Sequence, residues 1–405
     1  MVRPFGVSEA LSAAAGAVLM LLGGFVRLDE TASLLLRQWN TFGFFLGLMA
    51  ISAFAEEAGI FEALSNAAAR WGRGSAKRLY FAVFAVGAVI SVFLTNDSTA
   101  LILTPVVYAL VTRLRLPVLP FMFACTFIAD TASFVLPVSN PINIIIQGAF
   151  GSTLGTFLRY LLLPSIAAIG LNTALFLWLF RRQLAVSYEL PQPAQMRRRA
   201  PKLLLVSSCI LGLIAVAYVL GSILQLPLSC VALGGAAVMA LAALLSGRLD
   251  LRALKRRISW PIFLFIAGMF VVVHAVEDLG FTAAFGNALI RLAGGRPFPT
   301  VLLVAGGTAV GSNLINNVPM SLVMVSALHT LPTGAPAYHS LAFAAMFGAD
   351  LGPNLTTIGS LATMLWLLIL RRRGLEISTL EYFKLGVTFV PALILVGSLL
   401  IWARL

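Results

Sequence analysis

Three aspartates stand deep inside apolar sequence, where a charged side chain is costly. Asp97, Asp130 and Asp350 are the members of the 15 acidic residues that fall neither in loops nor near helix ends. A carboxyl group inside a membrane segment is by default a functional group that binds ions or protons. The alternative is structural, because a carboxylate also stabilises the N-terminus of a broken helix.

Neutral hydrogen-bonding residues surround these aspartates. The set comprises Asn96, Ser98, Thr99, Ser139, Asn140 and Asn143 in the first half, and Asn316, Asn317, Thr357, Gly359 and Ser360 in the second. With Asp97 they form the predicted substrate site, although any one Asn or Ser could instead satisfy freed backbone groups. No Lys or Arg lies within these stretches, so the set suits a small neutral hydroxylated solute. Asp97, Asp130 and Asp350 are the predicted proton-coupling residues.

The composition places these residues in a membrane. Of 405 residues 60% are apolar and 11% charged, whereas soluble domains carry about 25% charged residues. The apolar residues form blocks of about 20, the length of a membrane-spanning helix, without the alternation of a barrel strand. The prediction is an all-α polytopic membrane protein. No Walker A, HExxH or GxSxG motif occurs and the three cysteines form no CxxC pair, so no enzyme, cofactor or metal site is predicted.

Two segments, 79–112 and 299–331, are expected to fold back as re-entrant hairpins. A polar patch interrupts each at its middle and leaves arms of about 15 residues, too short to cross the bilayer. Discontinuous helices are expected where Gly and Pro let the backbone leave the helix around the other polar stretches. The expected spans are 8–26, 41–58, 118–150, 155–180, 203–223, 228–246, 258–276, 336–370 and 383–402.

The basic residues predict the orientation. With these spans, most of the 28 Lys and Arg residues flank one face, which the positive-inside rule makes cytoplasmic. The net charge of +13 therefore reports topology rather than binding to nucleic acid. The basic run 181–202 is interpreted as a cytoplasmic linker between an N-terminal transmembrane repeat, 1–180, and a C-terminal one, 203–405.

An internal repeat relates the two halves. Asn96-Asp97 recurs as Asn316-Asn317 at an offset of 220, whereas residues 47–59 match 268–280 at an offset of 221, so one single-residue insertion separates the matches. The spans 41–58 and 258–276 run in opposite directions, so the repeats have inverted topology. Inverted repeats with broken helices are typical of secondary transporters. Asp97 is the preferred proton carrier because its expected partner in this register, Asn317, carries no charge.

Several motifs resemble arsenical-pump membrane permeases, the ArsB family. The resemblance lies in residues 93–105 and 128–143 of the first half, and in 312–320 and 348–363 of the second. It implies a multi-pass protein of the bacterial inner membrane that exports arsenite and antimonite in exchange for protons. It also implies the ion-transporter superfamily fold, commonly a homodimer with elevator-like movement, and an optional soluble arsenite-stimulated ATPase partner. Pro141 departs from the family pattern, which expects an aliphatic residue there.

Other functions remain open at this point. A sodium- or proton-coupled transporter of dicarboxylates or other anions, from the same superfamily, is the nearest alternative, although Asp97 would repel an anion unless sodium compensates. Silicic acid is a small neutral hydroxide like arsenite, so the predicted site separates the two poorly. A cation channel with a carboxylate ring is disfavoured because two inverted hairpins meeting at a midplane fit alternating access better.

Overall fold

The computed structural model describes residues 9–189, 201–224, 226–329 and 337–405. Within them the regular secondary structure is helical, and the strand-type pairing is one isolated bridge between Ser75 and Ser187. The expected all-α membrane architecture is thus confirmed. Seven helices are long and apolar enough to span a membrane, or eight if α2 and α3, bent by 51°, form one span. Residues 190–200 of the expected basic linker lie outside the described residues.

The first half begins with helices of the N-terminal repeat and ends with a helix of 26 residues. Its elements are α1 (Glu9–Leu22), α2 (Leu28–Arg37), α3 (Trp39–Glu57), α4 (Ile60–Trp71), α5 (Ala76–Phe93), α6 (Asn96–Ser98), the π-helical turn η2 (Thr99–Leu103), α7 (Thr104–Arg113), α8 (Val118–Thr131), the 3₁₀ turn η3 (Pro137–Ser139), α9 (Pro141–Ala149) and α10 (Leu154–Leu179).

The second half repeats this order after one additional helix, α11. Its elements are α11 (Pro201–Ile223), α12 (Leu228–Leu245), α13 (Leu251–Arg257), α14 (Trp260–Asp278), α15 (Phe281–Leu292), α16 (Pro297–Ile315), α17 (Asn317–His329), α18 (Ala337–Leu351), the 3₁₀ turn η5 (Gly352–Leu355), α19 (Leu361–Arg372) and α20 (Thr379–Trp402).

Helix boundaries show the repeat and correct its register. The 19-residue helices α3 and α14 and the 12-residue helices α4 and α15 begin 221 positions apart. The hairpin tips keep this offset, because α6 begins at Asn96 and α17 at Asn317. The offset becomes 220 only further on, where α8 and α18 end. Asn96 therefore corresponds to Asn317, and Asp97 to Val318, one residue away from the pairing expected from the sequence.

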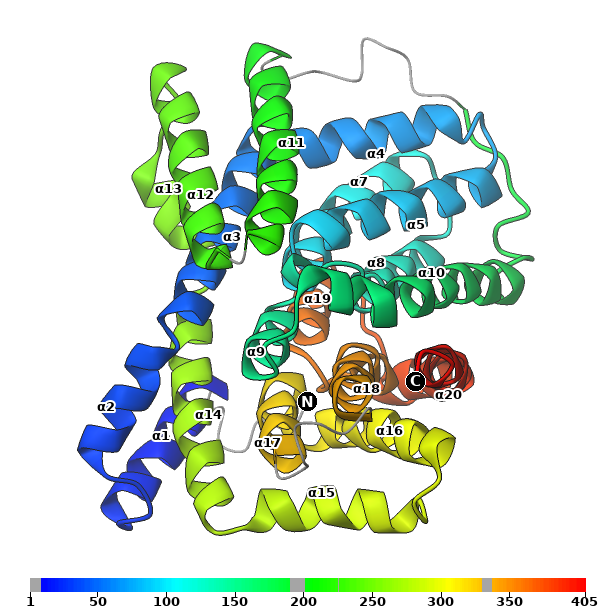
Figure 1. Ribbon diagram of the computed structural model, residues 1–405. Helices are drawn as coiled ribbons and strands as arrows, with labels where there is room; N and C mark the ends of the chain where they lie inside the picture. Colours follow the sequence, from blue (N-terminus) through cyan, green and yellow to red (C-terminus); the bar gives the residue numbers. More distant parts are fainter. Residues whose placement is uncertain (1–8, 190–200, 225, 330–336) are drawn as a thin grey trace.

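The inverted symmetry is visible in the arrangement of the helices. In Figure 1, α4 runs along the top and α15 along the bottom, each leading away from the long helices α3 and α14 at the left. The helices α5 and α16 then run back from the right toward the centre. The segments on either side of α4 and α15 thus form two groups of helices, which these two connectors link.

The halves exchange helices at their closest contacts. Helix α12 packs on α3, and α1 packs on α14. Repeat-related glycines make both approaches close: a Cβ atom on Gly47 would lie 2.5 Å from the backbone carbon of Ala232, and one on Gly268 would lie 2.6 Å from that of Ala13. Small residues at helix contacts are the usual means of close packing in membranes. Each half is therefore completed by a helix from the other.

Two buried apolar clusters divide the interior, and the exchange is visible in both. One joins α3–α8 to α11, α12 and α19 of the second half. The other joins α14, α16–α18 and α20 to α1, α9 and the first part of α10. Leu94 beside the first tip belongs to the first cluster, and Val318 of the second tip belongs to the other, so each tip packs with a different cluster.

The two arms of each hairpin differ in length. The outgoing arms α5 and α16 have 18 and 19 residues and are long enough to span by themselves. The return arms are shorter, Thr99–Arg113 and Asn317–His329. The expectation of short arms therefore holds for the return arms and is wrong for the outgoing ones. The return arm of the first hairpin begins with the π-helical turn Thr99–Leu103, a distortion that often accompanies functional sites.

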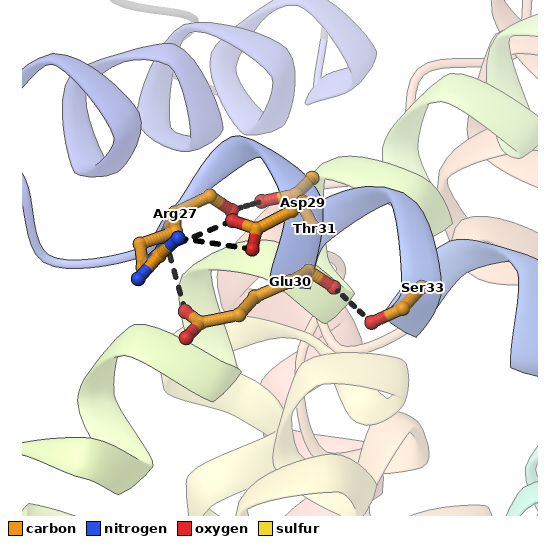
Figure 2. Close-up of polar contacts among 5 residues, drawn as sticks. All are labelled: Arg27, Asp29, Glu30, Thr31 and Ser33. Atoms are coloured by element: carbon orange, nitrogen blue, oxygen red, sulfur yellow. Dashed lines mark hydrogen bonds and ion pairs between the residues drawn. The ribbon is translucent and has the colours of Figure 1, made fainter.

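The turn between α1 and α2 pairs an arginine with acidic residues of α2. Figure 2 shows that the Arg27 guanidinium donates to both carboxylate oxygens of Asp29, at 3.1 Å each, while the Arg27 backbone N–H donates to Glu30 at 3.2 Å. Two acidic residues in the first turn of α2 also suit the positive end of its helix dipole. Arg27 therefore adds no free positive charge at this end of the molecule.

Candidate functional site

A small pocket lies where the hairpin tips and the broken helices meet. Its cavity of about 20 Å³ has room for roughly one water molecule. The pocket is therefore closed around its polar groups, and a larger solute requires movement of the wall. The lining residues are Asn96 and Asp97 of the first tip, Asn317 and Val318 of the second, Asn140, Pro141 and Ser360 at the breaks, and Phe45, Ile262 and Ile266.

Two helices begin at this pocket, and each is capped by a residue at the equivalent position of its repeat. The Asn140 side chain accepts from the Ile142 backbone N–H at 3.2 Å and begins α9. Ser360 accepts from the Thr363 N–H at 3.2 Å and begins α19. Pro141, the departure noted in the sequence, occupies the first turn of α9, where its fixed φ is favourable and its missing N–H is not needed. Both helices direct the positive ends of their dipoles toward the pocket.

Asparagines of the pocket hold the two deeper aspartates. The Asn96 amide donates to Asp130 Oδ1 at 3.2 Å, and the Asn140 amide donates to Asp350 Oδ1, which joins the two halves. Each aspartate is 1% exposed. The second carboxyl oxygen of each has no hydrogen-bond partner among the described residues. Asp130 and Asp350 therefore lie one hydrogen bond behind the pocket wall.

Asp97 is the ionisable residue of the pocket wall itself. Its backbone N–H donates to the Asn96 side-chain oxygen at 2.9 Å, which fixes the tip. Its carboxyl group lies within hydrogen-bonding reach of the Ala362 backbone N–H, in the first turn of α19 from the other half. Negative charge is favoured at a helix N-terminus, so α19 supports this carboxylate. The neighbouring Ser98 side chain lies outside the described part of the chain.

At the second tip the backbone of Asn316 is strained, and the side chain of Asn317 is available for binding. Asn316 has φ 78° and ψ 155°, a conformation that is almost restricted to glycine and costs about 1–3 kcal/mol. Its side chain accepts from the Val318 N–H at 3.3 Å and does not line the pocket. The Asn317 backbone N–H donates to Gly359 O at 3.0 Å. The Asn317 carboxamide lines the pocket and makes no hydrogen bond within the described residues.

The remaining predicted site residues support the backbone behind the pocket. Thr99 donates to Thr95 O at 2.8 Å, Ser139 donates to Val92 O at 2.9 Å, and Asn143 donates to Ser133 O at 2.7 Å. Thr357 is buried, and Gly359 packs on Pro353. These five residues do not line the pocket. Ser139 and Asn143 satisfy backbone carbonyls beside the breaks, whereas Thr99 donates to a carbonyl that its own backbone N–H also bonds.

The sequence did not single out the apolar side of the pocket. Phe45 of α3 and Ile262 and Ile266 of α14 form that side, and their residue types do not distinguish them from lipid-facing positions. Asn172 of α10 was also missed; it is fully buried and donates to Thr131 Oγ1 at 2.9 Å. A lone Asn inside an apolar span was the available signal. No group of three His, Cys, Asp or Glu residues able to hold a metal occurs among the described residues.

The inverted repeats, paired hairpins and central polar pocket together define a membrane transporter rather than an enzyme. The family model of citrate transporters matches residues 2–348. The arsenical pump membrane protein of Escherichia coli is 31% identical over 391 residues, which cover 95% of this chain and 91% of that protein. An uncharacterized transporter of Mycobacterium tuberculosis is 29% identical over 90% of this chain and 86% of its own length.

Similarity also extends to a solved structure. The YdaH transporter of Alcanivorax borkumensis aligns over 98% of both chains with a TM-score of 0.64 and 17% identity. At that identity the likeness shows the fold alone. The match to the family model establishes the family: the chain belongs to the citrate-transporter family of ion transporters, and arsenical pump membrane proteins are among its relatives.

Proposed function

We propose that this chain exports arsenite and antimonite from the bacterial cytoplasm, across the inner membrane, in exchange for protons. The observation that supports it is the lining of the pocket between the tips: neutral hydrogen-bonding groups, one carboxyl group and no cation. Arsenite at neutral pH is an uncharged trihydroxide that both donates and accepts hydrogen bonds. The names of the arsenical pump relatives favour the same substrate.

The pocket lining favours this substrate over citrate. A tricarboxylate needs Lys, Arg or a bound cation for its charges, and the pocket lining offers Asp97 instead. Two helix N-termini contribute only partial positive charge, and the Asp97 carboxyl group already lies against one of them. Silicic acid, a neutral tetrahydroxide, fits the same groups and is the second candidate.

Asp97 is the proposed proton carrier. Among the described residues, it is the one ionisable residue that lines the pocket wall, where an incoming solute would contact it. Asp130 and Asp350 are the alternatives, each tied to an asparagine of the wall. In the exchange, Asp97 would release its proton when the solute occupies the pocket and bind one on the opposite face. Antiport of this kind is driven by the proton gradient, so a soluble ATPase partner and a homodimer are compatible with it but not required by it.

Elevator-like movement is the proposed route for the solute. The α3 and α14 group and the hairpin group are joined by the connectors α4 and α15, and each connector begins at a repeat-related glycine with positive φ, Gly59 at 81° and Gly280 at 77°. A Cβ atom at either glycine would meet nothing within 4 Å. These open, left-handed positions are suited to changes of angle between the two groups.

Uptake of arsenite into everted vesicles tests the proposal. An acid-inside pH gradient should drive accumulation in vesicles that contain this chain, and a sodium gradient should not. Asp97→Asn should abolish the response to the pH gradient while the protein still folds, and Asp29→Asn, an exposed control at the α1–α2 turn, should leave it unchanged. Normal pH-driven accumulation by Asp97→Asn would transfer the role to Asp130 or Asp350. Absence of any arsenite transport, with transport of silicic acid or citrate instead, would contradict the substrate.

A further inference from the structure

A second cavity, of about 400 Å³, lies beside the site at the ends of several helices. Trp39 and Asn40 line it at the start of α3, and Gln147 and Gly148 line it near the end of α9. The stretch before α10, including Ser152, and the stretch before α12, including Pro227, complete the wall. The cavity thus lies between the group of helices around α3 and α12 and the group that contains the hairpins.

The same two helices reach both cavities. On α3, Phe45 lines the small pocket and Asn40 lines the second cavity, five residues and about 8 Å apart along the helix. On α9, Pro141 lines the small pocket and Gln147 lines the second cavity, six residues and about 9 Å apart. The second cavity therefore continues the small pocket along a path with α3 on one side and α9 on the other.

An apolar layer separates the two cavities. Phe45 is 4% exposed and belongs to the same buried cluster as Ile142 and Ile145 of α9. These side chains occupy the stretch between the cavities on both helices. A solute that leaves the small pocket toward α3 must displace this layer before it reaches the larger space.

The second cavity is lined by uncharged groups throughout. Asn40 Oδ1 accepts from the Ser229 N–H at 3.1 Å, which leaves the Asn40 amide hydrogens available. Gln147 Nε2 donates to Ser152 O at 2.9 Å, which leaves its carbonyl oxygen available. The cavity therefore presents a free donor and a free acceptor and no ionic group. This chemistry suits a small uncharged hydroxylated solute and offers no positive charge to pair with a carboxylate anion.

We propose that this cavity is a vestibule, a second place where the transported neutral hydroxide is held between the small pocket and water. The identity of the solute rests on the proposed function, whereas the connection of the cavity to water does not. The opposite end of α3 is held by Arg257 of the basic helix α13, which pairs with Glu56 at 2.8 Å. The positive-inside rule places that end in the cytoplasm, so the vestibule faces the exterior.

Gly148 provides a probe that fits the cavity. It lines the wall, and a Cβ atom there would meet nothing within 4 Å, so Gly148→Cys adds a thiol without a clash. Gly170 of α10 is a matched control, since it is also helical and open around its Cβ but does not line the cavity. Both variants belong in a background in which Cys125→Ala, Cys209→Ser and Cys230→Ser remove the native thiols.

Modification by a positively charged, membrane-impermeant methanethiosulfonate tests the vestibule. In right-side-out vesicles Gly148→Cys should react at least about tenfold faster than Gly170→Cys, and the modified protein should lose arsenite export. Reaction only from the cytoplasmic side would overturn the proposal, as would reaction only with a membrane-permeable thiol reagent, which would mark a lipid-filled cleft.

Protection by substrate separates this inference from the proposed function. Arsenite or, as a comparison, silicic acid should slow the modification of Gly148→Cys severalfold. External modification with no protection by either solute would keep the water-filled cavity but remove its holding role. Because the modification itself requires no substrate, a protein that fails to transport arsenite would still report whether the vestibule exists. Gly148→Trp, which fills the cavity, should block export, and full export by that variant would refute the route.

Discussion

Asn96 and Asn317 are equivalent in the two repeats, yet they should respond differently to substitution. The Asn96 side chain is used by the protein: it accepts from the Asp97 N–H and donates to Asp130. The Asn317 carboxamide lines the same pocket and has no hydrogen-bond partner among the described residues. We therefore expect Asn317→Ala to weaken solute binding with little effect on stability, and Asn96→Ala to reduce stability first.

The magnitudes follow from the hydrogen bonds. Loss of one bond to a neutral hydroxyl costs about 0.5–1.5 kcal/mol, so Asn317→Ala should raise the Kd for arsenite about two- to twelvefold. Asn96→Ala leaves two buried groups without a partner, the Asp97 N–H and Asp130 Oδ1. Each unsatisfied group costs about 1–3 kcal/mol, and a carboxylate costs more, so the free energy of unfolding should fall by at least about 2 kcal/mol.

Two measurements on purified protein test this contrast. Equilibrium binding of arsenite gives the Kd, and denaturant unfolding followed by tryptophan fluorescence gives relative stability. Asn66→Ala on α4, outside the pocket, is the control for loss of an asparagine. Equal destabilisation by Asn96→Ala and Asn317→Ala, or wild-type binding by Asn317→Ala, would refute the assignment of a structural role to one and a binding role to the other.

Three further outcomes are expected. Asn316→Gly should unfold at a higher denaturant concentration than Asn316→Ala, because glycine relieves backbone strain of about 1–3 kcal/mol that alanine keeps; equal midpoints would show that the tip is unstrained. Gly59→Ala and Gly280→Ala should each cost about 1–2 kcal/mol of stability and slow transport, whereas asparagine, which tolerates a left-handed conformation, should cost less. Backbone N–H groups of α13, chiefly that of Ala253, lower the pKa of Asp250 from its ordinary 3.8. The stabilisation of the folded protein by this carboxylate is therefore complete above pH 3.8 and disappears as the pH falls through the lowered pKa. Asp250→Asn should remove this acid dependence of stability, which unfolding measured at several pH values would show.

The sequence predicts the repeat and the polar centre because the bilayer makes polar residues conspicuous. A carboxyl or carboxamide group in an apolar block needs a physical reason, so Asp97, Asp130 and Asn140 could be picked out without a structure. Apolar residues carry no such signal. Phe45 lines the pocket and Phe81 is largely exposed on α5, yet nothing in the two residue types separates them.

The connectors α4 and α15 were missed for a related reason. Apolar blocks identify spans, whereas these 12-residue helices have one apolar and one polar face and fall between the blocks. The register at the tips shows a different limit. Residue similarity favours an offset of 220, which pairs Asp97 with Asn317. The starts of the helices depend instead on capping and backbone geometry, and in the structure they are 221 residues apart at the tips. Because the second tip has two adjacent asparagines, Asn96 meets an asparagine in either alignment, and the sequence alone does not exclude the offset of 221.

The corrected register sharpens the functional argument about Asp97. Two inverted repeats supply a nearly symmetric pocket, with Asn96 opposite Asn317 and two matched helix N-termini at Asn140 and Ser360. Symmetry alone would let the solute be held equally well from either side, and it gives no means to couple the movement to protons. The position of Asp97 is occupied in the other repeat by Val318, which cannot bind a proton. The exchange of one carboxyl group for one aliphatic side chain is therefore a chemical asymmetry between the two tips, and the proposed proton coupling through Asp97 rests on it.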